Sequence, residues 1–332
     1  MFRFPIAAIS AALILACATA TAAPAGELEP EVRAAFLAQV QAQHGIAPED
    51  AGALLDRARY QQSIIDAITR PAEAKPWKDY RPIFLTTDRI AKGQAFLATH
   101  QDALREIEAK TGVAAPILVA ILGVETGYGA NTGRYKVLDA LYTLGFFYPK
   151  RADFFRSELA HAFALAREER LDLDSIVGSY AGAMGWGQFI PSSYRAYAVD
   201  GDGDGQRDLW NSLPDVLASV ANYFAAHKWQ AGEPVAVRAV RASDAQEFVP
   251  DSLEARYSLP ELAARGYRPA EAIGHAAPAT LLRLEGANGP EYWITFNNFY
   301  VISRYNRSPL YSMAVLQLAQ AIAGTDSPAL AR

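Results

Sequence analysis

Apolar residues recur every three or four positions through the first two thirds of the chain, which is the spacing of amphipathic helices. Thr87 is placed to cap one such helix, and Thr111-Gly112 to end it. Pro71 and Pro76 break the pattern, so the residues from 77 to 85 are expected to link two helical parts. The expected helical stretches are 30–69, 87–110, 116–129 (ending in a glycine cluster), 138–144, 152–169 with its continuation 173–183, and 213–227.

At Gly232 the spacing changes from helical to alternating. Three segments alternate apolar and polar residues, as half-buried strands do: PVAVRAV, ATLLRLEG and EYWITFNN. The last two are separated by Ala287-Asn288-Gly289-Pro290, which predicts a hairpin. A short helix over 259–265 and a final helix over 311–323 complete the pattern. We therefore expect an α+β protein that is mostly α, with a small β subdomain near 232–300.

The first 22 residues have the organisation of a secretory signal peptide: one basic residue, Arg3, then an apolar run and small residues. The run is shorter than the roughly 20 apolar residues that a spanning helix needs. Ala20-Thr21-Ala22 offers a cleavage site, whereas Ile14-Leu15-Ala16-Cys17 resembles a bacterial lipobox, which would place a lipid on Cys17. Both alternatives predict an exported, periplasmic protein, and the second an outer-membrane lipoprotein. An ordinary buried N-terminal helix is the structural alternative.

Composition and charge exclude several classes of protein. With 51% hydrophobic and 20% charged residues among 332, the chain has the composition of a folded globular protein. Its 31 Lys and Arg stand against 36 Asp and Glu without a basic run, which argues against nucleic acid as a partner. A single cysteine, Cys17, and five scattered histidines provide neither an internal disulfide nor an H-x-x-x-H zinc site.

Glu125 follows a run of mostly apolar residues, in the segment Gly123-Val124-Glu125-Thr126-Gly127-Tyr128-Gly129. A carboxyl group in an apolar wall is disfavoured as the anion, so its pKa rises. A raised pKa suits a general acid at neutral pH. The flanking glycines would leave room for a bulky substrate. The structural alternative is an exposed or salt-bridged glutamate at a helix end.

Two further segments combine aromatic, amide and hydroxyl side chains. Residues 179–194, SYAGAMGWGQFIPSSY, have three glycines within six residues, which favours close approach by a ligand over a helix interior. The alternation of Tyr, Trp and Gln there would suit a sugar. Residues 297–308, NNFYVISRYNRS, form an aromatic and amide cluster before the last helix. The structural alternatives are a tight helix crossing for the first segment and ordinary loop and cap chemistry for the second.

The sequence Asp200-Gly201-Asp202-Gly203-Asp204-Gly205 matches D-x-D-x-D-G, the front half of an EF-hand calcium loop. Oxygen ligands at alternate positions surround a hard cation, and the glycine permits the turn. The back half departs from this pattern, because position 12 is Asn211 and the next carboxylate is Asp215. The expected role of the ion is structural, and a metal-free acidic turn is the alternative.

Taken together and in this order, GVETGYG, SYAGAMGWGQFIPSSY, the D-x-D-x-D-G loop and RYN resemble the lytic murein transglycosylases of the B type, glycoside hydrolase family 103. The resemblance covers most of the chain after the signal peptide. It implies a lysozyme-like α core with a flanking α domain and a small β subdomain. The domains expected are a signal peptide (1–22), an N-terminal α domain (23–115), the catalytic core with its calcium loop (116–230), the β subdomain (231–300) and a C-terminal helix returning to the core (301–332).

The resemblance also assigns roles to residues at matching positions. It makes Glu125 the single catalytic acid and base. The residues that it implies for substrate binding are Tyr80, Ser179, Gln188, Tyr305, Asn306 and Tyr311. The implied calcium ligands are Asp200, Asp202, Asp204, Gln206 and Asp215, the last of them at the end of a loop one residue longer than is usual in the family. Trp186 and Ile190 stand where tyrosine and methionine are common, and both keep apolar bulk.

The implied activity is cleavage of the β-1,4 bond between N-acetylmuramic acid and N-acetylglucosamine without water. Glu125 would protonate the bridging oxygen and then, as carboxylate, accept the proton of the muramic C6 hydroxyl, giving a 1,6-anhydro end. Catalysis needs no cofactor, and the implied partners are peptidoglycan strands and other cell-wall enzymes. Two rivals remain: a muramidase-type hydrolase, which needs a second carboxylate, and a calcium-stabilised scaffold that binds peptidoglycan without cleaving it.

Overall fold

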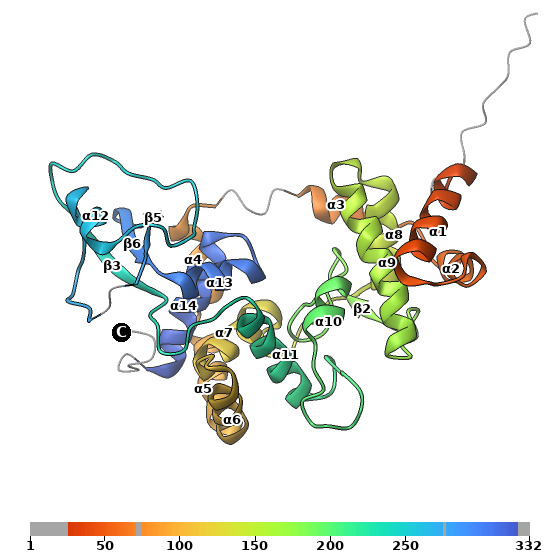
Figure 1. Ribbon diagram of the computed structural model, residues 1–332, viewed down its shortest axis with the longest axis horizontal. Helices are drawn as coiled ribbons and strands as arrows, with labels where there is room; N and C mark the ends of the chain where they lie inside the picture. The colour runs from red at the N-terminus through yellow and green to blue at the C-terminus, as the bar shows by residue number, and fades with distance from the viewer. Residues whose placement is uncertain (1–25, 71–74, 275–276, 325–332) are drawn as a thin grey trace, which may run out of the picture.

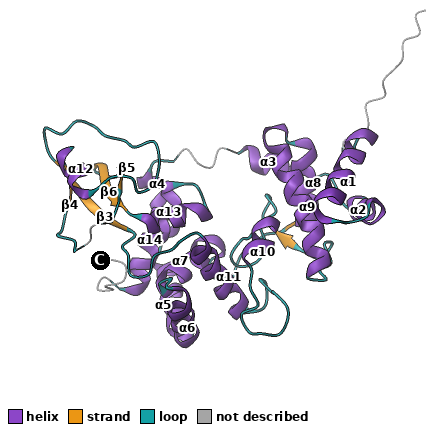
Figure 2. Cartoon of the chain, in the orientation of Figure 1, coloured by secondary structure: helices purple, strands orange, loops and turns teal. Residues whose placement is uncertain are grey.

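The computed structural model describes residues 26–70, 75–274 and 277–324. Helices predominate in this part of the chain and form two packed groups, with a small antiparallel sheet beside the second group (Figure 1). Figure 2 shows the same arrangement by secondary structure, with the four-stranded sheet at one end of the long axis and α1 at the other. The predicted signal peptide and Cys17 lie outside the described residues.

The first group of helices combines the start of the chain with a segment from its middle. Its members are α1 (Pro30–His44), α2 (Pro48–Leu55), α3 (Gln62–Thr69), α8 (Val137–Phe147), the 3-10 turn η1 (Pro149–Arg151) and α9 (Ala152–Glu168). α1 packs on α2 and α9, α3 packs on α8, and α8 lies against α9. Buried apolar side chains hold these helices together. For example, the ring of Phe36 on α1 packs edge to face against that of Phe163 on α9, with ring centroids 6.0 Å apart.

The second group surrounds α7. Its members are α4 (Trp77–Phe84), α5 (Thr87–Thr99), α6 (Gln101–Thr111), α7 (Ala115–Thr126), α11 (Leu213–Ala226), α13 (Asn297–Tyr305) and α14 (Pro309–Ala323). α5, α6, α11 and α14 all contact α7, and its residues from Ile117 to Leu122 have no exposed surface. A helix that is apolar on every side must be enclosed in this way. α10 (Pro191–Tyr197) contacts α9 and α11 and so lies between the two groups.

The sheet is antiparallel and has the strand order β4-β3-β6-β5. Its strands are β3 (Ala236–Arg241), β4 (Tyr267–Pro269), β5 (Thr280–Gly286) and β6 (Gly289–Thr295), with α12 (Leu259–Ala264) before β4. Gly286 pairs with Gly289 around Ala287-Asn288, so the predicted hairpin is confirmed. A second, two-stranded ladder joins β1 (Tyr135–Lys136) to β2 (Val177–Gly178). The expected α+β class, mostly α, is confirmed.

The stretch from 77 to 85 was expected to be a link between helices, and this is wrong. It contains α4, whose Trp77 is buried and whose contacts are with α14 and β5. Eight residues are too few for a helix that is stable by itself, so burial against these partners stabilises it. The sequence pattern could not show those partners, because they lie about 200 positions or more further along the chain.

The single helix expected over 87–110 is also wrong. It is interrupted at His100, where α5 ends and α6 begins. Thr86 rather than Thr87 caps α5, because the Thr86 side-chain oxygen accepts a hydrogen bond from the Arg89 amide at 3.2 Å. Both residues are threonine, and only the backbone conformation distinguishes the cap from the first helical position.

The expected continuation of helix through 173–183 is the third error. Val177 and Gly178 form β2, and the residues after them make turns and isolated bridges. Gly185 has a positive φ of 67°, and a Cβ there would lie 2.5 Å from the Leu209 carbonyl oxygen. Close approach of two backbone segments therefore requires glycine at this position.

Segment 23–115 contributes helices to both groups, because α1–α3 pack with α8 and α9 whereas α4–α6 pack with α7, α11 and α14. The division of the chain into the five expected domains stays a prediction. Within the described ranges, no single helix is long and apolar enough to cross a bilayer. α6 and α7 together reach that length but are bent by 111° where they meet.

Candidate active site

Glu125 lies in the last turn of α7, where the buried helix reaches the surface of the second group. Gly127 adopts a left-handed conformation with φ 60° and ends the helix two residues later. The side chain of Glu125 is half-buried, so it is reachable from solvent although protein surrounds its carboxyl group. The apolar segment thus ends by presenting one carboxyl group, as its sequence predicts.

The protonation of Glu125 is set by two opposing effects. Burial raises the pKa of Glu125 to about 7, since the charged form loses hydration there. The Tyr311 hydroxyl donates a hydrogen bond to Glu125 Oε1 at 2.6 Å, which favours the carboxylate and lowers the pKa. Burial is the larger effect. The group is therefore divided between acid and carboxylate near neutral pH, and the predicted raised pKa is confirmed.

Tyr305 lies near this carboxyl, and Tyr80 lies near Tyr311. The Tyr305 hydroxyl donates to the Gly187 carbonyl at 2.5 Å, and the charge of Glu125 adds to burial in raising the pKa of Tyr305. Tyr80 of α4 likewise adds to the raised pKa of Tyr311, so these two phenols are neighbours. The structure thus brings together residues from α4, α7, α13 and α14 that the sequence separates widely.

Ser179 and Gln188 hold the backbone of the irregular segment that lies beside Glu125. The Ser179 side-chain oxygen accepts hydrogen bonds from the amides of Ala181 at 3.2 Å and Ala183 at 3.1 Å. Gln188 donates through Nε2 to the carbonyls of Thr132 at 3.1 Å and Gly185 at 2.9 Å. Gln188 also has φ 52°, a conformation that is uncommon outside glycine and is concentrated at functional sites.

Thr126 and Trp186 connect α7 to this segment, and sequence reasoning gave neither of them a positioning role. Thr126 Oγ1 donates to the Trp186 carbonyl at 3.0 Å and accepts from the Gly129 amide at 3.0 Å. A Cβ on Gly129 would collide with the indole of Trp186, and one on Gly123 would lie 2.7 Å from the Tyr128 hydroxyl. These two glycines make room for aromatic side chains, whereas a Cβ on Gly127 would meet nothing within 4 Å, so the expectation of space for substrate stays a prediction for Gly127.

Asn306 lies in the break between α13 and α14. Its side chain is exposed, and Oδ1 accepts a hydrogen bond from the Ser308 amide at 3.1 Å. Ser308 in turn caps α14, since its side-chain oxygen accepts from the Tyr311 amide at 3.4 Å. This turn fixes the first residues of α14, and with them the direction from which Tyr311 reaches Glu125.

The aspartates of the D-x-D-x-D-G loop come together as expected. Ligand oxygens of Asp200, Asp202 and Asp204 lie within 4.8 Å of one another, and all three side chains are exposed. Backbone amides, led by that of Gly205, lower the pKa of Asp200. Three ionised oxygen donors at this separation suit a hard cation such as Ca²⁺, so the residues present fit the implied ion.

Asp215 has a different environment from these three aspartates. It is 1% exposed, and its two carboxylate oxygens accept from the amides of Gly201 at 2.7 Å and Asp208 at 2.6 Å. It therefore fastens both ends of the loop to the first turn of α11. Gln206 is exposed, and its amide donates to Asp204 Oδ1 at 2.8 Å. Asp215 does not belong to the cluster of three within the described part of the chain.

Comparison with known proteins decides the family. The Transglycosylase SLT domain matches residues 29–320. The chain is 41% identical over 298 residues to the membrane-bound lytic murein transglycosylase B of Escherichia coli K12, covering 87% of this chain and 81% of that protein. The chain belongs to the lytic murein transglycosylase B family. It is accordingly a lytic transglycosylase that acts on peptidoglycan, as the four sequence segments indicate.

Solved structures of this family have the same fold. The lytic transglycosylase SltB1 of Pseudomonas aeruginosa is 49% identical, with a TM-score of 0.83 over 89% of this chain and 97% of its own. Escherichia coli Slt35 in complex with calcium is 40% identical, with a TM-score of 0.79 over 88% and 92%. Pseudomonas aeruginosa SltB3 in complex with NAG-anhNAM-pentapeptide is 33% identical, with a TM-score of 0.78 over 89% and 79%.

Replacing Tyr311 by Phe should change the pH profile of this transglycosylase. In the wild type, kcat/KM should fall as the pH rises through about 7, because the protonated form of Glu125 is then lost. The variant loses the hydrogen bond that favours the carboxylate, so the pKa of Glu125 rises and the fall begins at higher pH. We expect kcat to drop about tenfold as well, since a charge-assisted hydrogen bond no longer orients the carboxyl.

Tyr300→Phe is the matched control for this measurement. Tyr300 also donates its hydroxyl to a glutamate, Glu254 Oε1, at 3.1 Å. That pair lies outside the group of tyrosines around Glu125, so its loss should leave the profile unchanged. A Tyr311→Phe enzyme with the wild-type profile would show that Tyr311 does not control the protonation of Glu125.

Proposed function

We propose that Glu125 is the one carboxyl group that performs the chemistry, first as acid and then as base. The observation that carries this proposal is its setting, a half-buried carboxyl with a pKa of about 7 that accepts a hydrogen bond from Tyr311. A group with that pKa holds both protonation states in comparable amounts at neutral pH. It therefore donates a proton in one step and accepts one in the next at little energetic cost.

In the first step, protonated Glu125 donates its proton to the oxygen that links C1 of N-acetylmuramic acid to N-acetylglucosamine. The bond between C1 and that oxygen breaks, and the N-acetyl group of the muramic acid stabilises the positive charge at C1. The carboxylate of Glu125 then accepts the proton of the C6 hydroxyl, and the C6 oxygen bonds to C1. One proton passes through Glu125, no water is consumed, and the products are a free hydroxyl end and a 1,6-anhydro end.

The surrounding side chains orient the reactants in this proposal. Tyr311 fixes the carboxyl of Glu125 through its hydrogen bond. The proposed sugar contacts come from Tyr80 on α4 and from Tyr305 and Asn306 at the end of α13. Ser179 and Gln188 would make further contacts with the sugars. Their hydrogen bonds to the loop backbone would fix the positions of both side chains before the substrate binds.

A hydrolase would need a second carboxylate to activate water or form a covalent intermediate. Such a group close to Glu125 would raise its pKa by repulsion. Within the described residues, burial and the Tyr311 hydrogen bond account for the pKa of Glu125, and no second carboxylate contributes. This supports a reaction in which the substrate's own C6 hydroxyl takes the place of water.

Digestion of purified peptidoglycan sacculi tests the proposed reaction. We expect muropeptides that are lighter by one water than those with reducing ends, because the C6 oxygen rather than water closes onto C1. Mass spectrometry of the released fragments distinguishes the two products directly. Reducing ends would overturn the proposal and indicate hydrolysis, and sacculi that are bound but uncut would indicate a scaffold.

We further propose that the loop from Asp200 to Asp204 holds a structural calcium ion. The support is the cluster of three carboxylates and the calcium complex of the related Slt35. The carboxylates of Asp200, Asp202 and Asp204 would coordinate the ion, with Gln206 and Asp215 as further candidate ligands. A bound ion would neutralise the repulsion among the three charges and stiffen the loop between α10 and α11. It takes no part in the proton transfers of Glu125.

Thermal unfolding tests the calcium proposal without relying on activity. A ligand that binds only the folded state at about 100 times its Kd stabilises by about 2.7 kcal/mol. We therefore expect a higher Tm in calcium than in chelator for the wild type, and no such difference for Asp202→Ala. Asp244→Ala, which removes an exposed aspartate elsewhere, should keep the full calcium effect. Equal Tm values for the wild type in calcium and chelator would contradict the proposal.

We propose that the protein is exported, with peptidoglycan strands and other cell-wall enzymes as partners. The support is the signal-peptide pattern of the first 22 residues and the membrane-bound description of the related Escherichia coli enzyme. A lipid on Cys17 would anchor the mature chain to a membrane, whereas cleavage after Ala22 would release it. The mass of the mature chain distinguishes these alternatives.

A further inference from the structure

Two half-buried histidines meet where α1, α9 and α10 come together. His44 is the last residue of α1 and His161 lies in the middle of α9, with 4.9 Å between their ring centroids. The guanidinium of Arg195, on α10, contacts both rings and also binds Glu168 of α9. These four residues form a histidine cluster. None of them has a role in the reaction proposed for Glu125, so the cluster needs its own explanation.

The hydrogen bonds of the cluster require both imidazoles to be neutral. A guanidinium has donors and no acceptor, so a ring nitrogen that faces it must accept. Arg195 Nη1 lies 2.7 Å from His161 Nδ1 and 3.4 Å from His44 Nδ1. Both Nδ1 atoms are therefore unprotonated, and each ring carries its proton on Nε2. A second proton on either ring would set donor against donor and positive charge against positive charge.

The carboxylates beside the cluster are already paired with arginines. Glu168 Oε1 accepts a hydrogen bond from Arg195 Nη2 at 2.7 Å, and Arg207 approaches Glu168 Oε2 at 3.9 Å. Glu169 pairs with Arg207. Two arginines thus balance two carboxylates, and Arg167 adds a further positive charge at the end of α1. Protonation of both histidines would leave the cluster with a net positive charge.

Burial makes the charged forms of the histidines still less favourable. His44 Nε2 is buried and has no hydrogen-bond partner in the part of the chain that the structure describes. Burial lowers the pKa of both His44 and His161, and the positive charge of Arg195 lowers both further, whereas Glu168 acts weakly in the opposite direction. The charge of His44 also lowers the pKa of His161. Geometry and solvation therefore favour the same neutral state.

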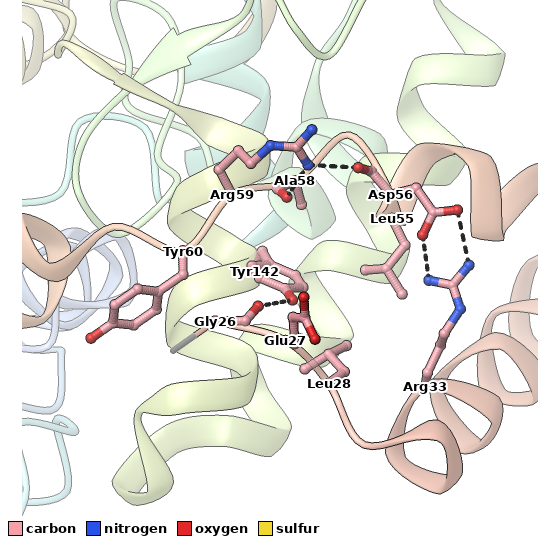
Figure 3. A pocket seen from close by; sticks show the side chains of 10 residues that line it. All are labelled: Gly26, Glu27, Leu28, Arg33, Leu55, Asp56, Ala58, Arg59, Tyr60 and Tyr142. Atoms are coloured by element: carbon pink, nitrogen blue, oxygen red, sulfur yellow. Dashed lines mark hydrogen bonds and ion pairs between the residues drawn. The ribbon is translucent and has the colours of Figure 1, made fainter. Parts of the chain in front are cut away.

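Another cluster of charged groups in the first helical group lacks this sensitivity to pH (Figure 3). It lines a cavity of about 730 Å³, where Arg33 pairs with Asp56 at 2.7 Å. Arg59 donates there to the carbonyls of Asp56 and Ala58 at 2.6 and 2.8 Å. Figure 3 shows these side chains, and no histidine is among the described residues that line the cavity. Histidine is the side chain that ordinarily changes charge between about pH 5 and 8.

The helix α10 connects the histidine cluster to the active site. It has seven residues (Pro191–Tyr197), too few to be stable by itself, so its position depends on its tertiary contacts. It contacts α9 and α11, and Arg195 adds the contact with the end of α1. The helix begins three residues after Gln188 and ends three residues before Asp200. A change in its position is therefore passed directly to the segment beside Glu125.

We propose that His44, His161 and Arg195 form an acid-sensitive contact that holds α10 against α1 and α9 and releases it when the histidines are protonated. A base whose pKa is lower in the folded than in the unfolded protein stabilises the fold fully above its unfolded pKa, which is about 6.5 for histidine. This stabilisation is lost as the pH falls below that value. Release of α10 loosens the segment that carries Gln188, so the enzyme binds peptidoglycan less tightly in acid.

Thermal unfolding at two pH values tests the contribution of the histidines to stability. Asparagine accepts a hydrogen bond from Arg195 as Nδ1 does but does not titrate. Between about pH 7.5 and 5.5, the Tm of the wild type should fall by about 2 °C or more beyond the fall in His44→Asn/His161→Asn. His100→Asn replaces a half-buried histidine between α5 and α6 and should behave as the wild type does. Equal falls in the wild type and the double variant would overturn the proposal.

Hydrogen exchange with peptide-resolved mass spectrometry locates the opening in the wild type alone, so it does not depend on how the double variant folds. After correction for the intrinsic rate, the amides of α1 and α10 should lose protection about fivefold or more from about pH 7.5 to 5.5. The amides of α14, which lie away from the cluster, should keep theirs. Unchanged protection in α1 and α10, or an equal loss in α14, would contradict an acid-sensitive contact at this place.

Kinetics connect the cluster to binding and separate it from the chemistry of Glu125. The protonated form of Glu125 is retained in acid, so the proposed reaction by itself predicts no loss of kcat/KM there. We expect KM on sacculi to rise about threefold in the wild type between about pH 6.5 and 5.5, and to stay constant in the double variant. A constant wild-type KM would overturn the connection to the active site. If the wild type cleaves nothing at any pH, the proposed reaction fails and hydrogen exchange alone judges the cluster.

Discussion

Glu125→Gln is expected to lower kcat on sacculi by about a thousandfold, which is within the range that general acid–base catalysis contributes. The amide has nearly the shape of the carboxyl and still accepts the hydrogen bond from Tyr311, so the fold around it should persist. It has no proton to donate to the bridging oxygen and no carboxylate to accept the C6 proton. Both steps of the proposed reaction therefore fail together. Release of anhydro-muropeptides, followed by mass spectrometry, measures the loss.

Binding and stability controls make this result specific. Glu125→Gln should still bind sacculi, and its Tm should be no lower than that of the wild type, because a buried ionisable group has been made neutral. Glu106→Gln removes an exposed glutamate on α6 and should retain full activity. A Glu125→Gln enzyme that releases anhydro products at an appreciable fraction of the wild-type rate would rule out Glu125 as the acid.

Asp215→Ala is expected to lower the free energy of unfolding by about 3 kcal/mol, because the amides of Gly201 and Asp208 would lose the two hydrogen bonds that they donate to a buried carboxylate. For a protein of this size, that corresponds to a decrease in Tm of roughly 4–5 °C. The variant also removes a negative charge from the first turn of α11, where it interacts favourably with the helix dipole. Thermal unfolding followed by circular dichroism measures the change.

The calcium dependence of this effect distinguishes two roles for Asp215. If its hydrogen bonds to the loop ends are what matter, the loss of stability should be of similar size in calcium and in chelator. Asp215→Asn keeps one acceptor oxygen and should fall between the wild type and Asp215→Ala. A difference between wild type and Asp215→Ala that disappears in chelator would instead show that Asp215 acts only as a calcium ligand.

The parts of the site that could be predicted from sequence are those controlled by local pattern. The apolar run that forms α7 ends in one carboxyl group, that of Glu125. This pattern predicts that protein surrounds the carboxyl group and raises its pKa, and the structure shows both. The spacing of Asp200, Asp202 and Asp204 similarly brings their carboxylates together within one short loop. Neither conclusion depends on how distant segments pack.

Long-range contacts account for what the pattern missed. The helix α4 was missed, because it is stabilised by the packing of Trp77 among elements far away in sequence and not by a local pattern. The positioning contacts of Thr126 and Trp186 have no local signal either, since they join the end of α7 to a loop about 60 residues later. The paired Asp215 oxygens likewise depend on where the two ends of the loop meet α11.

The sequence by itself determined most of the helical and strand-forming segments, the half-buried carboxyl of Glu125 and the acidic loop, because hydrophobic spacing, glycine placement and ligand spacing act over a few neighbouring residues. Only the tertiary structure decided that Tyr311 donates to Glu125 across 186 positions, and that Arg195 contacts both His44 and His161. Those arrangements arise when helices pack together, so their energies depend on partners that no local stretch of sequence contains.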